Sequence, residues 1–223
     1  MKCQVCKKWN NDWAMTCVSC GAEIVVSPSD PRAEKVRVAR EKHAEQIRSL
    51  RLVQNGQYLQ ASQIANGFHA RQARKYGDSV DLSVSDERGP LALVQDLFSL
   101  HPGILAEIPR DALVPFRVAA AMQEIWGDTD CDQWLPKERV PGFRHDNATI
   151  ARMLLFAALH KYNLWQYQHG GVVTHVKILP AKRPCSSCLE LSRKQYSLDK
   201  VPELPNPKCT HELGCRCTHT PVI

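Results

Sequence analysis

The chain has 223 residues, of which 43% are hydrophobic and 23% charged, and its formal net charge is +6. These values are typical of a globular protein and exclude disorder over the whole chain. No run of about 18 apolar residues occurs, and no apolar signal core follows the first charge. We therefore expect a cytoplasmic protein without a membrane partner, built from one main core with small accessory modules or from two domains.

Cysteine is the most informative residue type in this sequence. Eight of the ten cysteines lie in Cys-x-x-Cys or Cys-x-Cys groupings near the two ends. In a reducing compartment, such clusters indicate metal ligands and not disulfides. Two zinc ions, each bound by four thiolates, would lower the formal net charge from +6 to +2. Bulk charge is then a weak argument for a nucleic-acid partner.

Two Cys-x-x-Cys knuckles, separated by ten residues, stand at the start of the chain: Cys3 with Cys6, and Cys17 with Cys20. Each knuckle directs two sulfurs at one ion, and the spacing allows the pairs to complete a tetrahedron. The spacing and Gly21 resemble the zinc-ribbon class, which implies an adaptor role. We predict a zinc ribbon over residues 1–26, with a closed site that leaves no position for a substrate.

Lysine and tryptophan side chains lie between the two knuckles, at Lys7, Lys8, Trp9 and Trp13. Basic residues beside exposed aromatic rings can follow a phosphate backbone and stack on bases. A module this small has almost no core, however. We therefore favour the alternative, in which the two tryptophans cover the metal site or dock on the next domain.

Residues 27–77 are predicted to be a linker followed by a basic helical hairpin. Asp30 and Pro31 are a suitable start for a helix over 31–53, and a second helix is predicted over 58–76. Both helices are rich in positive charge. The candidate nucleic-acid contacts are Arg48, Arg51, Arg71 and Arg74. The alternative is that these charges form only a solvated face.

Residues 78–170 are predicted to form a helical core. A polar loop over 78–89 precedes apolar helices over 91–100 and 113–126. After a polar stretch over 127–142, Asp146 or Asn147 can cap a long amphipathic helix that ends near Gly170. The predicted fold class is therefore mainly α, with small β-containing zinc modules at the two ends.

Residues 171–223 are predicted to be a cysteine-rich zinc module with a strand over 172–179. Cys185 and Cys188 are the firm pair of ligands. The other two ligands must come from Cys209, His211, Cys215 and Cys217. We favour Cys209 and Cys215, with His211 as the next choice. Since there are more candidates than places, a spare thiol or an open coordination position is an alternative.

This C-terminal part resembles phage Mu F-like head-morphogenesis proteins. The resemblance rests on a strand, a Cys-x-x-Cys, the stretch 196–205, and a histidine followed by Cys215-Arg216-Cys217. It covers residues 172–223, and it differs from the family pattern by one extra residue between His211 and Cys215, by the lack of a proline after the histidine, and by the additional Cys209. The resemblance implies a metal-stapled module in a phage or prophage-like assembly, with no catalytic residue to transfer.

Two enzymatic alternatives use zinc or another metal on nucleic acid or nucleotides. His43-Ala44-Glu45 and Pro184-Cys185 to Cys188 match the letters of a zinc deaminase, but about 140 residues separate the two motifs. His145-Asp146-Asn147 is a candidate for a nuclease site, although helix capping explains the same residues. A carboxylate at Glu45, Glu190 or Glu212 beside an open metal position would favour an enzyme. The predicted function is a zinc-binding adaptor that bridges protein or nucleic-acid partners, not an enzyme.

Overall fold

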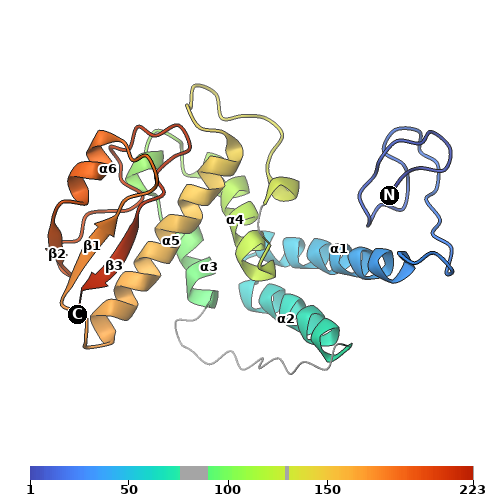
Figure 1. Cartoon of the computed structure of the whole chain (residues 1–223), viewed down its shortest axis with the longest axis horizontal. Helices are drawn as coiled ribbons and strands as arrows, with labels where there is room; N and C mark the ends of the chain where they lie inside the picture. The colour runs from blue at the N-terminus through green and yellow to red at the C-terminus, as the bar shows by residue number, and fades with distance from the viewer. Residues whose placement is uncertain (76–89, 129–130, 223) are drawn as a thin grey trace. The chain divides into compact units, whose positions relative to one another are not determined.

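A computed structural model describes residues 1–75, 90–128 and 131–222 (Figure 1). Two compact units make up the chain: Met1–Asn55 with Gln60–Leu82, and Gly56–Leu59 with Ser83–Ile223. Helices account for about half of the described residues, and cysteine clusters lie near both ends. The predicted loop over 78–89 lies outside the described residues.

The first unit begins with two short turns that are closed by antiparallel bridges, Lys2 with Trp9 and Thr16 with Glu23. Each turn contains one of the two knuckles. A small core lies between the turns and the first helix, α1 (Ala33–Gln54). Its buried members are Met1, Cys3, Ala14, Cys17, Ile24 and Val36. Two of these six residues are cysteines, so thiols supply a large part of the packing in this module.

Helix α1 starts later than the sequence predicted, and Asp30 is not its N-cap. The Asp30 carboxylate accepts the backbone N–H of Arg32 at 2.8 Å and also pairs with the Arg32 guanidinium. Since the carboxylate is used in this turn, the helix begins at Ala33, and the N-cap residue Arg32 makes no side-chain capping bond. A local side-chain bond has replaced the predicted cap.

Helix α2 (Tyr58–Lys75) follows α1 after a turn at Gly56, whose φ of +74° suits glycine. The buried Ser49 hydroxyl of α1 donates to the carbonyl oxygen of Ala61 in α2 at 3.1 Å. Small buried residues in α2, among them Ala61 and Ala65, allow this close approach. The two predicted helices are present, although polar residues help to form the buried face.

The second unit is centred on three helices that pack on one another: α3 (Pro90–Ser99), α4 (Val114–Trp126) and α5 (Asn147–His169) (Figure 1). Short 3-10 turns connect them, namely η1 (Gly103–Leu105), η2 (Asp111–Leu113) and η3 (Asp132–Trp134). Residues 118 to 122 of α4 are buried on all sides. As predicted, Asp146 caps α5, because its side chain accepts the Thr149 N–H.

A three-stranded antiparallel sheet packs against α5, with strand order β2-β1-β3. The strands are β1 (His175–Leu179), β2 (Gln195–Ser197) and β3 (Thr218–Val222), and helix α6 (Ser186–Leu191) lies between the first two. Only β1 was predicted. β2 has only three residues. β3 contains Pro221, which has no N–H to donate; an edge strand tolerates proline because one side of the strand has no neighbouring strand to bond. Among the described residues, no helix is long and apolar enough to cross a membrane.

Gly214, in the loop before β3, lies against α5. A Cβ atom at this position would come within 2.8 Å of the Met153 sulfur and 2.9 Å of Thr149 Cγ2, and the backbone φ is +70°. Gly142, in the same unit, has a φ of +71° but no atom within 4 Å of its Cβ position. A side chain at either position would strain the backbone, but only one at Gly214 would also clash with neighbouring atoms.

We expect Gly214→Ala to lower the free energy of unfolding by about 2–4 kcal/mol, the sum of left-handed strain and overpacking. Gly142→Ala, with strain alone, should cost about 1 kcal/mol. Urea unfolding of both variants measures the difference. Equal losses would mean that the approach of this loop to α5 is looser than described.

Candidate metal centres

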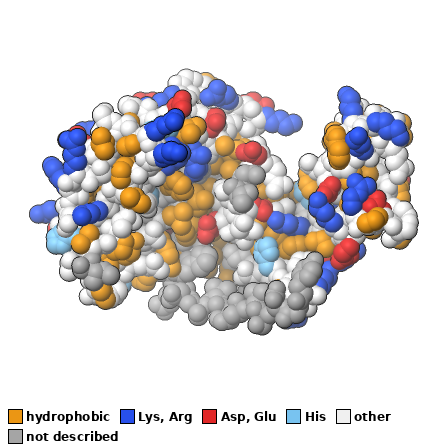
Figure 2. Space-filling model, viewed as in Figure 1, with side chains coloured by type: hydrophobic (Ala, Val, Ile, Leu, Met, Phe, Trp, Pro, Cys, Tyr) orange, Lys and Arg blue, Asp and Glu red, His pale blue; other side chains and the backbone are white. Residues whose placement is uncertain are grey.

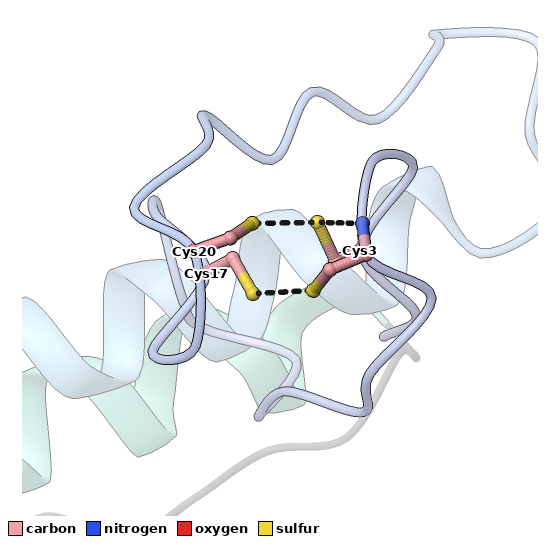
Figure 3. Close-up of side chains that lie close together, drawn as sticks. Cys3, Cys17 and Cys20 are labelled. Carbon is pink, nitrogen blue, oxygen red and sulfur yellow. Dashed lines mark hydrogen bonds between the residues drawn. The ribbon is translucent and has the colours of Figure 1, made fainter.

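The four N-terminal cysteines form one group, and Figure 3 shows the sulfurs of Cys3, Cys17 and Cys20 pointing toward one another. Their sulfur atoms all lie within 4.8 Å of one another. The Cys3 and Cys20 sulfurs are 3.6 Å apart, and the Cys6 and Cys17 sulfurs are 3.4 Å apart. A zinc–sulfur bond of about 2.3 Å implies a tetrahedral edge of about 3.8 Å. The four thiols could therefore hold one metal ion in a zinc-ribbon-like arrangement.

Backbone N–H groups in each knuckle stabilise the thiolate form of the first cysteine. The N–H groups of Cys6 and Val5 point at the Cys3 sulfur, at 3.5 and 3.4 Å, and lower the Cys3 pKa despite its burial. The Ser19 N–H donates to the Cys17 sulfur at 3.4 Å and is the main cause that lowers the pKa of Cys17 to about 6. Since metals bind thiolates, protons compete less for these two sulfurs than for free cysteine.

The knuckles are anchored to α1 within the first unit. The Arg40 guanidinium donates to the carbonyl oxygens of Ala14 and Ile24, at 3.0 and 2.8 Å. The Trp13 ring stacks on His43, with ring centroids 3.9 Å apart. Trp9, by contrast, is 70% exposed. Trp13 therefore docks on α1, as in the favoured prediction. Trp9 is an exposed aromatic ring, as in the other one.

We expect Arg40→Ala to weaken this anchor, because one side chain donates to two backbone carbonyl groups. Hydrogen bonds from a charged donor contribute about 1.5–3 kcal/mol. Faster hydrogen exchange over residues 14–24 is the measurement. Arg48→Ala is the matched control on the same helix, since Arg48 forms a surface ion pair with Glu45. Similar exchange in both variants would contradict the anchoring role.

Five cysteines gather in the second unit, in two groups of three that share Cys188. Cys185, Cys188 and Cys209 have sulfur atoms within 4.8 Å of one another, and so do Cys188, Cys215 and Cys217. The Cys185 and Cys209 sulfurs are 3.7 Å apart, and those of Cys188 and Cys215 are 3.9 Å apart. All four of the favoured ligands thus belong to this cluster, as does Cys217, but they are divided between the two three-sulfur groups.

His211 lies outside both sulfur groups. Its Nδ1 accepts the Leu213 N–H at 3.0 Å, and its Nε2 is 3.4 Å from the Arg216 guanidinium. The first contact occupies one nitrogen lone pair, and the second places a cation beside the other. The C-terminal groups therefore consist of cysteine alone among the described residues.

The C-terminal sulfurs come from two local elements. Cys185 is the N-cap of α6 and Cys188 lies within it, while the other three follow in the chain that leads to β3. The Asn206 amide donates to the Cys188 sulfur at 3.5 Å. All of these cysteines except Cys185 are at most 3% exposed. The protein therefore excludes water from most of the cluster.

A row of basic side chains on and before α5 holds the backbone of the cysteine loop. Arg144 donates to the Cys209 carbonyl, His145 to that of Glu212 at 2.9 Å, and Arg152 to that of Leu213 at 2.6 Å. His160 bonds the Cys217 carbonyl at 3.0 Å. Sequence reasoning missed these four positioning residues, because their partners are carbonyl groups 57 to 67 residues away.

The C-terminal thiols shift one another's pKa values. Contact with the Cys215 thiol is the largest cause that lowers the pKa of Cys209 to about 5 and the pKa of Cys217 to about 6. The same contacts raise the pKa of Cys215, and burial raises that of Cys188. Two buried thiolates beside protonated neighbours are a favourable environment for a cation.

The residues of the two enzymatic alternatives make structural contacts. His145 donates to Glu212, Asp146 caps α5, and Asn147 donates to the carbonyl groups of Pro136 and Glu138. His43 stacks on Trp13, and Glu45 pairs with arginines. Within the described residues, neither these carboxylates nor Glu190 or Glu212 joins a cysteine group.

The basic hairpin is partly neutralised by its own acidic residues. Arg48 pairs with Glu45 at 2.7 Å, and Arg71 lies 3.3 Å from Glu41 and 3.4 Å from Glu45. Within the described part of the chain, Arg51 and Arg74 make no such pair. On the face shown in Figure 2, red side chains lie among the blue ones. These pairs reduce the charge available for a polyanion.

No family model, no curated protein and no solved structure matches this chain. The resemblance to head-morphogenesis proteins and the nucleic-acid role of the hairpin therefore remain predictions. The arrangement of the thiols carries the functional argument.

Proposed function

We propose that this protein is a zinc-binding adaptor, with one structural zinc ion near each end. The observation that carries the proposal is the all-sulfur composition of both centres, at sulfur separations of 3.4 to 3.9 Å. Four thiolates complete a tetrahedral zinc shell, so neither centre offers a position for substrate or activated water. At the C-terminal end, the four ligands are Cys185, Cys188, Cys209 and Cys215.

The N-terminal centre presents side chains to a partner. The knuckle residues Val5 and Val18 are 69% and 87% exposed, and Trp9 is 70% exposed. The Lys2 ammonium lies over the Trp9 ring, and Lys7 and Lys8 are exposed beside it. An exposed aromatic ring among lysines suits a single-stranded nucleic acid, which stacks on the ring and pairs its phosphates with the amines. The proposed partner at this end is therefore a nucleic acid.

The other end of the adaptor would attach to a protein assembly. Support comes from the C-terminal pattern that resembles phage Mu F-like head-morphogenesis proteins. In this proposal, the metal fixes the strand-containing module on α5, and that module is the contact with the assembly.

Metal content tests the two-site proposal. We expect two zinc ions per chain in protein purified without added metal, and one in each of the variants Cys3→Ser and Cys185→Ser, because each variant removes one ligand of a four-ligand site. Elemental mass spectrometry provides the count. Cys131→Ala is the control, since Cys131 is a buried cysteine outside both clusters and its loss should leave two ions bound. A parent protein without zinc would contradict the proposal.

The Trp9 surface can be tested with single-stranded oligonucleotides. We expect Trp9→Ala to weaken binding by about 5- to 150-fold, which corresponds to about 1–3 kcal/mol for one base stacked on an aromatic ring. Fluorescence anisotropy at two salt concentrations measures the affinity. Met15→Ala removes another exposed apolar side chain of the same module, 59% exposed, and should have little effect. If the affinity of the Trp9 variant equals that of the parent, nucleic acid does not bind at this face.

A further inference from the structure

The C-terminal cluster contains one sulfur more than a tetrahedral zinc site uses. Cys185, Cys188, Cys209, Cys215 and Cys217 are all free thiols. Cys217 is 3% exposed and belongs to a group with Cys188 and Cys215, so its sulfur lies in the cluster and not at the surface. A single four-coordinate ion leaves this buried thiol without a metal bond.

The spatial arrangement of the five thiols divides them in a different way. They form two three-sulfur groups, and Cys188 is the member common to both. Three-sulfur coordination is a geometry that copper(I) favours, since it is a soft, monovalent ion with a closed d shell, and thiolates select it. Two three-coordinate ions need six sulfur positions. Five thiolates supply six positions when one of them bridges.

We propose that the C-terminal cluster can also bind copper(I) in place of zinc, with two three-coordinate ions bridged by the Cys188 sulfur. One ion is bound by Cys185, Cys188 and Cys209, and the other by Cys188, Cys215 and Cys217. Copper enters as copper(I), each cysteine that is still protonated releases one proton to the solvent when its sulfur binds copper, and no electron is transferred. The inference rests on the proposed metal binding at these thiols.

The surroundings of the cluster favour such a centre. Five thiolates with two copper(I) ions carry a net negative charge, and Arg144, Arg152 and Arg216 contact the cysteine loop or its histidine. The Asn206 amide donates to the Cys188 sulfur, which bears the bridge. Burial of four of the five cysteines shields bound copper from water and oxidants.

The test is the number of copper(I) ions that the full chain binds under anaerobic, reducing conditions in the presence of a bathocuproine competitor. Native mass spectrometry counts the ions in the parent, in Cys217→Ser and in the control Cys131→Ala. The N-terminal cysteines are the same in all three proteins, so their contribution cancels in the differences. We expect Cys217→Ser to bind one copper(I) fewer than the parent and the control to match the parent.

Two further measurements make the outcome decisive. Zinc content should be the same in Cys217→Ser and in the parent, since Cys217 is the sulfur that zinc does not use. X-ray absorption at the copper edge should show copper–copper scattering from the C-terminal cluster that weakens in Cys217→Ser. Equal copper counts in variant and parent would overturn the two-copper centre. A loss of zinc from Cys217→Ser would also overturn the two-copper centre, because Cys217 would then be a zinc ligand. Absence of zinc from the parent protein would contradict the adaptor proposal, which is a separate outcome.

Discussion

The close approach of thiol groups is the constraint on which the rest of this structure depends. Sulfur atoms 3.4 to 3.9 Å apart repel one another once they are ionised, so each cluster is stable as a set of thiolates only with a cation at its centre. The chain prepares for that cation through N–H groups directed at Cys3 and Cys17, and through the pKa shifts that the thiols around Cys215 cause in one another. Metal binding would supply the folding free energy that a small core cannot provide.

The N-terminal module has a small core because it is short. The N-terminal module buries only a few apolar side chains, and two of its buried residues are themselves cysteines. Modules of this size usually need a metal or disulfides to fold. Both modules also use a helix as a support: Arg40 and Trp13 connect the first to α1, and basic side chains on and before α5 hold the second. In the proposed metal-bound form, metal and helix together would fix the position of each loop.

Exposure and pairing of charges determine where partners can bind. The arginines of the hairpin were the first candidates for nucleic-acid contact, but Glu41 and Glu45 neutralise part of their charge. Trp9 and the lysines beside it have no comparable acidic partner among the described ion pairs, and the ring is exposed to solvent. The ribbon is therefore a better candidate surface than the more basic helices, although its total charge is smaller.

Local sequence patterns determined much of the architecture. The helices at Tyr58, Val114 and Asn147 begin close to their predicted positions, because apolar periodicity and the Asp146 cap act within a few residues. The spacing of the four N-terminal cysteines was sufficient to predict that they converge, since a knuckle is a local turn. Predictions failed where a local bond competed, as at Asp30, and where strands were short, as at β2 and β3.

Only the tertiary structure decided the features that depend on contacts distant in sequence. Four side chains hold carbonyl groups more than fifty residues away, and a pattern in the local sequence cannot predict such contacts. They are Arg144, His145, Arg152 and His160. The same holds for the inclusion of Cys217 in the C-terminal cluster and for the position of His211 outside it. The sequence by itself determined which residues can bind a metal, because ligand chemistry belongs to the side chain. Which of them meet is a property of the folded backbone.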